Sequence, residues 1–299
     1  MVDRAAASVA WGASLGTMLQ GLFADRVAAT FTALAALLIG AGLAFPNAFA
    51  SDAAGLVALI LIAVVGLPHG ALDIHLAMRS RLPRMQALGV YGLIALVGGI
   101  AWLSVPVLLI LVFLALSVWH FAQDFKALGR LTAFGAALSV LLMPILAFTA
   151  ETQAIFAMLM PESQAALVIG TATLFWPVVA ATGAALALKS LKRPGLALAT
   201  GLAIIAGAVL PPIVAFALYF CAWHSAGHIR AVFADAPVRR IGLGEAALYA
   251  AMTLSLLAGL VAVWSWSGME APMVRAVFGL LVILTLPHMA IVELWQRRG

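Results

Sequence analysis

Charge is scarce in this sequence. Only 9% of the 299 residues are charged and 65% are hydrophobic, whereas an ordinary soluble domain carries about 25% charged residues. So few charged groups cannot cover a water-facing globule of this size, which excludes a soluble enzyme, a nucleic-acid-binding module and a disordered chain. The apolar runs are also unbroken, so the alternating pattern of a membrane β-barrel is missing. The composition predicts an all-α fold, a polytopic transmembrane helical bundle.

Cysteine is nearly absent too. The single cysteine, Cys221, excludes an internal disulfide, a zinc ribbon and a redox pair. The net charge of +5 is explained in a membrane protein by Lys and Arg in cytoplasmic loops, so we expect no nucleic-acid partner. No clear signal-peptide cleavage site is present near the N-terminus. We expect residues 1–26 to form an amphipathic lead-in to one transmembrane catalytic domain of residues 27–299.

Ten apolar segments are long enough to be membrane spans. A helix needs about 20 apolar residues to cross the hydrocarbon core, and breaks that contain proline, glycine or serine separate the closest pairs of segments. The predicted spans cover residues 27–45, 55–78, 87–103, 106–125, 131–149, 164–188, 195–210, 212–230, 245–266 and 272–295.

The basic residues orient these spans. Every second connection carries Lys or Arg, and all basic residues except Arg275 fall on that one side. The opposite connections carry acidic residues: Asp52, Glu151, Glu162 and Glu270. Because cytoplasmic loops are enriched in Lys and Arg, this alternation predicts a multi-pass protein of the cell inner membrane with both termini in the cytoplasm.

Six histidines lie within the apolar segments, where ionisable side chains are costly and are candidates for function. All six are on even-numbered spans, which run from outside to inside. Four of them lie between six and ten residues before a basic residue that marks the cytoplasmic boundary: His69, His120, His224 and His288. At about 1.5 Å per residue they share a depth of roughly 9–15 Å, as residues that converge on one centre would. His75 lies near a helix end, where we expect an interfacial role.

The sequence around the histidines repeats a local pattern. It reads LPHGALD at 67–73, VWHFAQD at 118–124, AWHSAGH at 222–228 and LPHMAIVE at 286–293. In the first three copies a second polar residue follows the histidine by four positions: Asp73, Asp124 and His228. Positions i and i+4 share one face of a helix, so we expect each helix to aim two polar groups inward. The fourth copy has Glu293 at i+5.

Neutral imidazoles are ligands for zinc, copper, nickel and iron. His224 and His228 form an H-x-x-x-H pair, but Ser225 stands where a zinc peptidase with that motif has its glutamate base. The six histidines include no adjacent pair of the kind that membrane di-iron desaturases use. A metal transporter is also disfavoured, because the chain has no His-rich loop and no acidic ion pathway. A single non-haem mononuclear iron, with open positions for oxygen, fits best.

The four histidine motifs resemble those of a known family. GLPHGALDIH (66–75), SVWHFAQDF (117–125), CAWHSAGHIR (221–230) and TLPHMAIVELW (285–295) are similar, in this order, to motifs of the Brp/Blh family of bacterial and archaeal β-carotene 15,15′-dioxygenases. The resemblance extends from about residue 55 to the C-terminus. It implies an integral membrane, Fe(II)-dependent enzyme that uses O2 to split the central double bond of β-carotene into two all-trans-retinal molecules. It also implies which residues bind the metal and are catalytic: His69, His120, His224 and His228.

The neighbouring polar residues have two interpretations. Asp73 and Asp124 could lie behind the ligands, where they would orient the imidazoles and offset the charge of the iron. His288 and Glu293 would belong to the same layer, unless His288 is a fifth ligand. In the rival arrangement two histidines and one carboxylate bind the iron, and Asp73 or Asp124 is coordinated directly. The sequence leaves both open.

A long hydrocarbon such as β-carotene dissolves in the bilayer, so its enzyme would gain from a tunnel that opens to membrane lipid. Four aromatic residues near the ligands could line such a tunnel, although ordinary packing is the simpler explanation for them: Trp119, Phe121, Tyr219 and Trp223. A retinal product would suit a functional pairing with a retinal-binding rhodopsin. Two alternatives to the dioxygenase remain at this point, a b-type haem electron-transfer protein and a non-enzymatic carotenoid-binding or transport protein.

Overall fold

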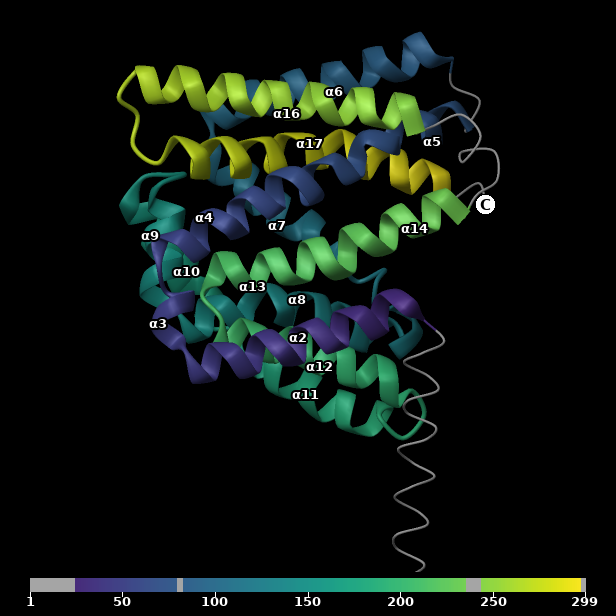
Figure 1. Ribbon diagram of the computed structural model, residues 1–299, viewed down its shortest axis with the longest axis vertical. Helices are drawn as coiled ribbons and strands as arrows, with labels where there is room; N and C mark the ends of the chain where they lie inside the picture. Colours follow the sequence, from purple (N-terminus) through teal and green to yellow (C-terminus); the bar gives the residue numbers. More distant parts are fainter. Residues whose placement is uncertain (1–24, 80–82, 235–242, 297–299) are drawn as a thin grey trace, which may run out of the picture.

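The computed structural model describes residues 25–79, 83–234 and 243–296, and within these ranges all regular structure is helical. The predicted all-α class is therefore confirmed. Figure 1 shows the helices as a bundle in which most of the long ones run along a similar direction. Most of the expected lead-in 1–26 lies outside the described residues. Its last part is seen as Asp25, which caps the first described helix by accepting from the backbone N–H of Val27 and Ala28.

The helices follow one another with short connections, and labels that begin with η mark 3-10 and π-helices. The first part of the chain forms α2 (Arg26–Ala44), α3 (Pro46–Phe49), α4 (Asp52–Leu61), η1 (Ile62–Gly66), η2 (Leu67–Leu72), α5 (Asp73–Arg79), α6 (Arg84–Ser104), α7 (Pro106–Phe121), η3 (Lys126–Leu128) and α8 (Arg130–Ala147). The second part forms α9 (Thr149–Ala157), α10 (Glu162–Thr173), α11 (Trp176–Lys189), α12 (Pro194–Val209), α13 (Pro212–Tyr219), η4 (Phe220–Ser225), α14 (Ala226–Ala234), α16 (Leu243–Trp266) and α17 (Pro272–Gln296).

Seven helical segments among the described residues are long and apolar enough to cross a membrane. They are Arg26–Ala44, Asp52–Gly70, Arg84–Ser104, Arg130–Ala147, Glu162–Lys189, Gly244–Trp266 and Pro272–Glu293. α7 and α12 are apolar but shorter, and the predicted span 212–230 is divided among α13, η4 and α14. Each of the ten predicted segments thus contains helix, and seven of them have the length of a span.

The helix that carries His69 changes its geometry just before that residue. η1 is a π-helix and η2 is a 3-10 helix, and Pro68 is the second residue of η2. Proline lacks the N–H that an α-helix needs, and its ring collides with the carbonyl four residues earlier. A wide turn before Pro68 and a tight turn after it relieve this collision. They also set the direction in which His69 leaves the helix.

Two other histidine-bearing segments are irregular as well. η4, which carries His224, is a π-helix between α13 and α14, and α17 contains Pro287 directly before His288. A π-turn holds more residues than an α-turn, and such turns are frequent at functional sites. These departures rotate the side chains that follow them, so α-helical spacing alone does not give the positions of the histidines.

The bundle has two groups of helices. α12 packs on α2 and α8, and α11 packs on α8, whereas α17 packs on α6 and α16. In Figure 1, α2, α11 and α12 lie toward the lower edge and α6, α16 and α17 toward the upper edge, with α4, α13 and α14 between them. The main apolar core includes the fully buried Phe31, Phe125 and Val277. α17 also packs on α7 and η2, and η1 packs on η4, so the histidine-bearing segments meet where the two groups adjoin.

Candidate metal centre

Five of the six histidines meet in one cluster. His69 comes from η2, His120 from the last turn of α7, His224 from η4, His228 from α14 and His288 from α17. The centroids of neighbouring rings lie 4.7 to 5.6 Å apart, and the rings meet edge to face. Four of the five residues are buried and His228 is half-buried. The histidines that the sequence places at one depth therefore share one centre.

Two carboxylates hold the cluster from outside. His224 Nδ1 donates to Asp124 Oδ2 at 3.0 Å, and His288 Nδ1 lies 2.9 and 3.0 Å from the two carboxylate oxygens of Asp73. Each aspartate follows a histidine by four residues, yet the histidine that it holds belongs to another helix. η2 is a 3-10 helix and a turn follows α7, so neither segment keeps the α-helical register over those four residues. A carboxylate behind an imidazole fixes the ring and makes it a better metal ligand.

The main chain orients His69 instead. Its Nδ1 donates to the backbone carbonyl of Gly66, three residues earlier. Carbonyl and carboxylate oxygens accept hydrogen bonds, so these contacts assign the ring proton of His69, His224 and His288 to Nδ1. The Nε2 atom of each of these rings then carries a free lone pair.

Three of the five Nε2 atoms in the cluster have no hydrogen-bond partner in the protein. Those of His69, His224 and His228 are buried and have no hydrogen-bond partner, and those of His120 and His288 lie 3.2 Å apart. An unpaired buried acceptor costs about 1–3 kcal/mol, so three of them within one cluster of imidazole rings indicate a positively charged ligand. A divalent transition-metal ion fits this donor set, because neutral imidazole nitrogens are its usual ligands.

Asp73 also permits a second ligand arrangement. One ligand atom from each of Asp73, His228 and His288 lies within 4.8 Å of the others, which is the composition of a site with two histidines and one carboxylate. The Asp73 side chain is fully buried, and its Oδ2 accepts from the Tyr91 hydroxyl at 3.5 Å. In both arrangements Asp73 and Asp124 place negative charge where a buried cation needs it.

The packing of the rings bears on the kind of cofactor. A b-type haem needs a flat porphyrin between two axial histidines. The neighbouring rings described here meet edge to face at centroid distances of 4.7 to 5.6 Å, which leaves no slot for a porphyrin between them. This spacing suits nitrogens arranged around one small ion.

Gly66 and Gly70 permit the close packing beside the cluster. A Cβ atom at Gly70 would lie 3.1 Å from Asp73 Oδ2 and 3.6 Å from His288 Nδ1. A Cβ atom at Gly66 would lie 2.5 Å from the ring of Phe220, which is closer than real Cβ contacts come. The missing side chains therefore let η1 approach η4 and let η2 approach α17.

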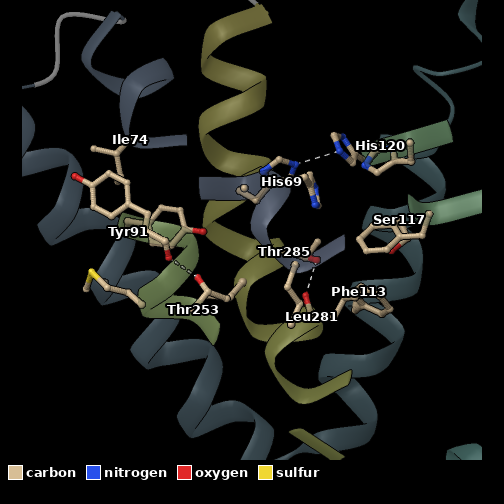
Figure 2. Close-up of a pocket in the computed structure, with 18 of the residues that line it drawn as sticks. His69, Ile74, Tyr91, Phe113, Ser117, His120, Thr253, Leu281 and Thr285 are labelled. Carbon is tan, nitrogen blue, oxygen red and sulfur yellow. Dashed lines mark hydrogen bonds between the residues drawn. The ribbon is translucent and has the colours of Figure 1, made fainter. Parts of the chain in front are cut away.

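A largely apolar cavity of about 270 Å³ adjoins the cluster. Four of the histidines line it: His69, His120, His224 and His288. Figure 2 shows that the cavity extends from His69 and His120 toward Tyr91 and Thr253 in one direction and toward Phe113 in another. Apolar walls with a few convergent polar groups are typical of a site for a small apolar ligand.

Comparison with known families decides which chemistry this site belongs to. The chain matches the family described as Beta-carotene 15,15′-dioxygenase over residues 60–296, a range that includes the whole histidine cluster. The chain belongs to this family. Because the family is one of dioxygenases, the protein is an enzyme, which argues against the haem electron-transfer and carotenoid-transport alternatives.

Two curated relatives of the β-carotene 15,15′-dioxygenase family resemble this chain over most of their length. It is 28% identical over 257 residues to the "Beta-carotene 15,15′-dioxygenase" of the uncultured marine bacterium 66A03, which covers 79% of this chain and 92% of the relative. It is 31% identical over 290 residues to the "Probable beta-carotene 15,15′-dioxygenase Blh" of Halobacterium salinarum, which covers 80% of this chain and 84% of the relative. No solved structure matches the chain.

The four aromatic residues considered for a substrate tunnel of this dioxygenase have different surroundings. Phe121 lines the cavity. The Tyr219 hydroxyl donates to Asp124 Oδ2 at 2.7 Å, so this residue supports the carboxylate that holds a histidine. Trp119 is 44% exposed and Trp223 is buried in the core. A substrate contact by all four residues stays a prediction.

The dioxygenase cavity also has lining residues that the sequence did not reveal. Tyr91 of α6, and Tyr249 and Met252 of α16, are on its wall. They belong to apolar helices without a histidine motif. Only the packing of these helices in the folded protein brings the three residues to the site. Glu293 is half-buried on α17, and the side chain of His75 lies outside the described residues. The roles expected for these two residues stay predictions.

Proposed function

We propose that this protein is a membrane-embedded, non-haem Fe(II) dioxygenase that cleaves the central 15,15′ double bond of β-carotene. One oxygen atom of O2 enters each of the two all-trans-retinal molecules that result. The observation that carries the proposal is the buried imidazole cluster beside an apolar cavity, in a chain of the β-carotene 15,15′-dioxygenase family. β-Carotene and O2 both partition into apolar phases, so a site within the bilayer would meet both. Pairing with a retinal-binding rhodopsin stays a prediction.

The proposed iron ligands share one feature, an Nε2 atom directed into the cluster: His69, His120, His224, His228 and His288. The support for His288 is that its Nε2 lies 3.2 Å from that of His120 while its Nδ1 is held by Asp73. Fe(II), when bound, would supply the one-electron chemistry that lets O2 react with a closed-shell double bond.

The protein's own groups would prepare this reaction. Asp73 and Asp124 each fix an imidazole and offset the positive charge of the ion. The two extensions of the cavity, toward Tyr91 and toward Phe113, would hold the two arms of the polyene so that its central bond lies beside the imidazoles. Their apolar lining would exclude water from the reacting atoms.

The proposed topology has ten spans with both termini on the cytoplasmic side of the inner membrane. Two ion pairs support it, because each joins residues that the charge pattern assigns to that side. Arg84 and Glu245 approach to 3.2 Å between α6 and α16, and Arg230 and Asp25 approach to 3.2 Å between α14 and the cap of α2. In Figure 1 the starts of α2 and α16 and the end of α14 lie toward the same end of the bundle.

Expression in cells that accumulate β-carotene tests this function. We predict that the cells lose their colour and form retinal. Replacement of any of four ligands by Ala should abolish retinal formation while the protein still inserts into the membrane, because each removes a metal ligand: His69, His120, His224 and His228. Unchanged pigment in cells that contain the folded protein would contradict the proposal.

Ser139→Ala is the matched control. Ser139 is a fully buried polar residue of α8 outside the cluster, so its replacement also removes a buried polar group but no metal ligand. We expect this variant to form retinal at the normal rate. Full activity in one of the histidine variants would remove that histidine from the ligand set.

A further inference from the structure

The cavity beside the imidazoles reaches the outer surface of the bundle between α6 and α16. Its wall there consists of three residues from each helix: Leu88, Tyr91 and Gly92, and Tyr249, Met252 and Thr253. Gly92 is exposed and Met252 is 59% exposed, whereas the histidines at the other end of the cavity are buried. The cavity therefore connects the cluster with the surroundings of the protein.

This opening lies deep within two candidate spans. α6 and α16 are long and apolar, and only 11% and 6% of their most apolar windows are buried inside the protein. Gly92 is five residues after the start of the predicted span 87–103 and Met252 is seven residues after the start of 245–266, which places them at a depth of roughly 8–11 Å. Half the thickness of the hydrocarbon core is about 15 Å. In a membrane the opening would therefore face lipid tails.

The two helices are tied together at one end of the gap. Arg84 donates to Glu245 Oε1 at 3.2 Å and to the Tyr249 hydroxyl at 3.0 Å. Farther along, α6 packs on α17, and α16 packs on η2 and α17. At the level of the opening, a Cβ atom built on Gly92 meets nothing within 4 Å, so glycine leaves free space there.

We propose that the gap between α6 and α16 is the entrance through which a polyene hydrocarbon passes sideways from the lipid to the imidazole cluster, and that Gly92 keeps it open. The identity of the polyene as β-carotene rests on the proposed function. The largely apolar cavity matches a hydrocarbon, and the hydroxyls of Tyr91 and Tyr249 at the opening are paired with Asp73 and Arg84. Because the opening lies within the bilayer, the substrate would not have to pass through water. A larger side chain at Gly92 would stand in this path.

A pair of leucine substitutions isolates the effect of the entrance. Gly92→Leu adds a branched side chain at the opening. Gly89→Leu is the matched control, because Gly89 is an exposed glycine of the same helix whose Cβ would also meet nothing within 4 Å, and it does not line the cavity. Leucine is a better helix former than glycine, so both variants should fold.

Binding of β-carotene without O2 measures the entrance separately from the reaction. The full-length, iron-loaded protein is placed in lipid nanodiscs under anaerobic conditions, and quenching of its tryptophan fluorescence reports association. We expect Gly92→Leu to slow association by at least about tenfold and Gly89→Leu to change it by less than about twofold. In air, kcat/KM for retinal formation should fall in the same order.

The outcomes separate the entrance from the reaction. Unaltered association in Gly92→Leu would overturn the entrance even if the protein forms retinal. Slowed association in Gly92→Leu, combined with no retinal from the unaltered protein in air, would support the entrance and overturn the proposed reaction. If the unaltered protein binds no β-carotene, the entrance for this polyene is overturned as well.

Discussion

At the scale of single residues, much of the electrostatics of the site depends on two aspartates. Asp73 is fully buried and accepts from His288. Asp124 accepts from His224 and from the Tyr219 hydroxyl. A buried carboxylate is costly unless it is paired and hydrogen-bonded. A cation bound by the two histidines would stabilise both carboxylates, and the carboxylates would in turn strengthen the histidines as ligands.

Asp73→Asn keeps the size of the side chain and removes its charge. We predict that iron affinity falls about 10–100-fold and that retinal formation falls with it, because partners of metal-ligating histidines have effects of this size. Iron analysis of the purified protein over a range of chelator concentrations measures the change. Asp52→Asn is the control, since Asp52 is exposed in the first turn of α4. Equal iron affinity in Asp73→Asn and the unaltered protein would contradict this role.

Four histidines of the cluster could be named from the sequence, because their distance from the basic residues gives their depth in the bilayer: His69, His120, His224 and His288. His228 could be named from its spacing to His224 and from the family resemblance. Their partners could not be named in the same way. The i+4 spacing suggests that Asp73 accompanies His69, whereas the structure pairs it with His288, 215 residues away. Likewise the Tyr219 hydroxyl reaches a carboxylate 95 residues away. Such contacts depend on how the helices pack, and the spacing of residues within one helix does not predict them.

At the scale of elements, the segments that carry His69 and His224 both depart from α-helical geometry. The sequence predicts continuous spans at 55–78 and 212–230, because apolar composition determines only the length of a span. Pro68 gives a visible reason for η1 and η2. η4 contains no proline, and the close contact of Phe220 with Gly66 accompanies its π-turn. That contact could be found only from the packed structure.

Gly66→Ala tests the contact between η1 and η4. The new Cβ would lie 2.5 Å from the Phe220 ring, so η1 or η4 must shift, at a cost of about 1–3 kcal/mol in the free energy of unfolding. We predict a lower midpoint of thermal unfolding and weaker iron binding, since Gly66 also accepts the hydrogen bond that orients His69.

Gly55→Ala provides the comparison for that variant. Gly55 lies in α4, and a Cβ there meets nothing within 4 Å. The midpoint of thermal unfolding should stay the same or rise slightly, because alanine favours a helix by about 0.5–1 kcal/mol over glycine. If Gly66→Ala unfolds at the same temperature as Gly55→Ala, η1 and η4 do not pack as the structure shows.

At the scale of the whole molecule, large apolar side chains cover the outside of the bundle while Asp73 and most of the histidine cluster are buried inside it. Leu37 is 67% exposed, Leu93 is 61% exposed and Leu103 is 81% exposed, and an apolar exterior of this kind suits contact with lipid. The helical class and the apolar segments were predictable from the sequence, because only helices and closed barrels satisfy the backbone in a membrane and the unbroken apolar runs exclude a barrel. The order in which the helices pack could not be predicted, because one apolar helix face fits many others and does not indicate which helix it contacts.

Reporter fusions test the orientation of the chain. We predict that a reporter enzyme that is active only outside the cytoplasm gives activity when it is fused at Glu270, between α16 and α17, and none when it is fused at Lys192, between α11 and α12. The reason is that connections rich in Lys and Arg, such as the one that contains Lys192, stay in the cytoplasm, whereas Glu270 lies in a connection on the opposite side. The reverse pattern of activities would contradict the proposed topology.

The most direct test of the iron dioxygenase is a single turnover of the purified, iron-loaded protein with β-carotene and isotopically labelled O2, in which the products are reduced to retinol at once so that the label is kept. We predict two product molecules for each β-carotene consumed, with one labelled oxygen atom in each. Intact β-carotene after exposure of the folded, iron-loaded protein to O2, or label in only one of the two products, would contradict it.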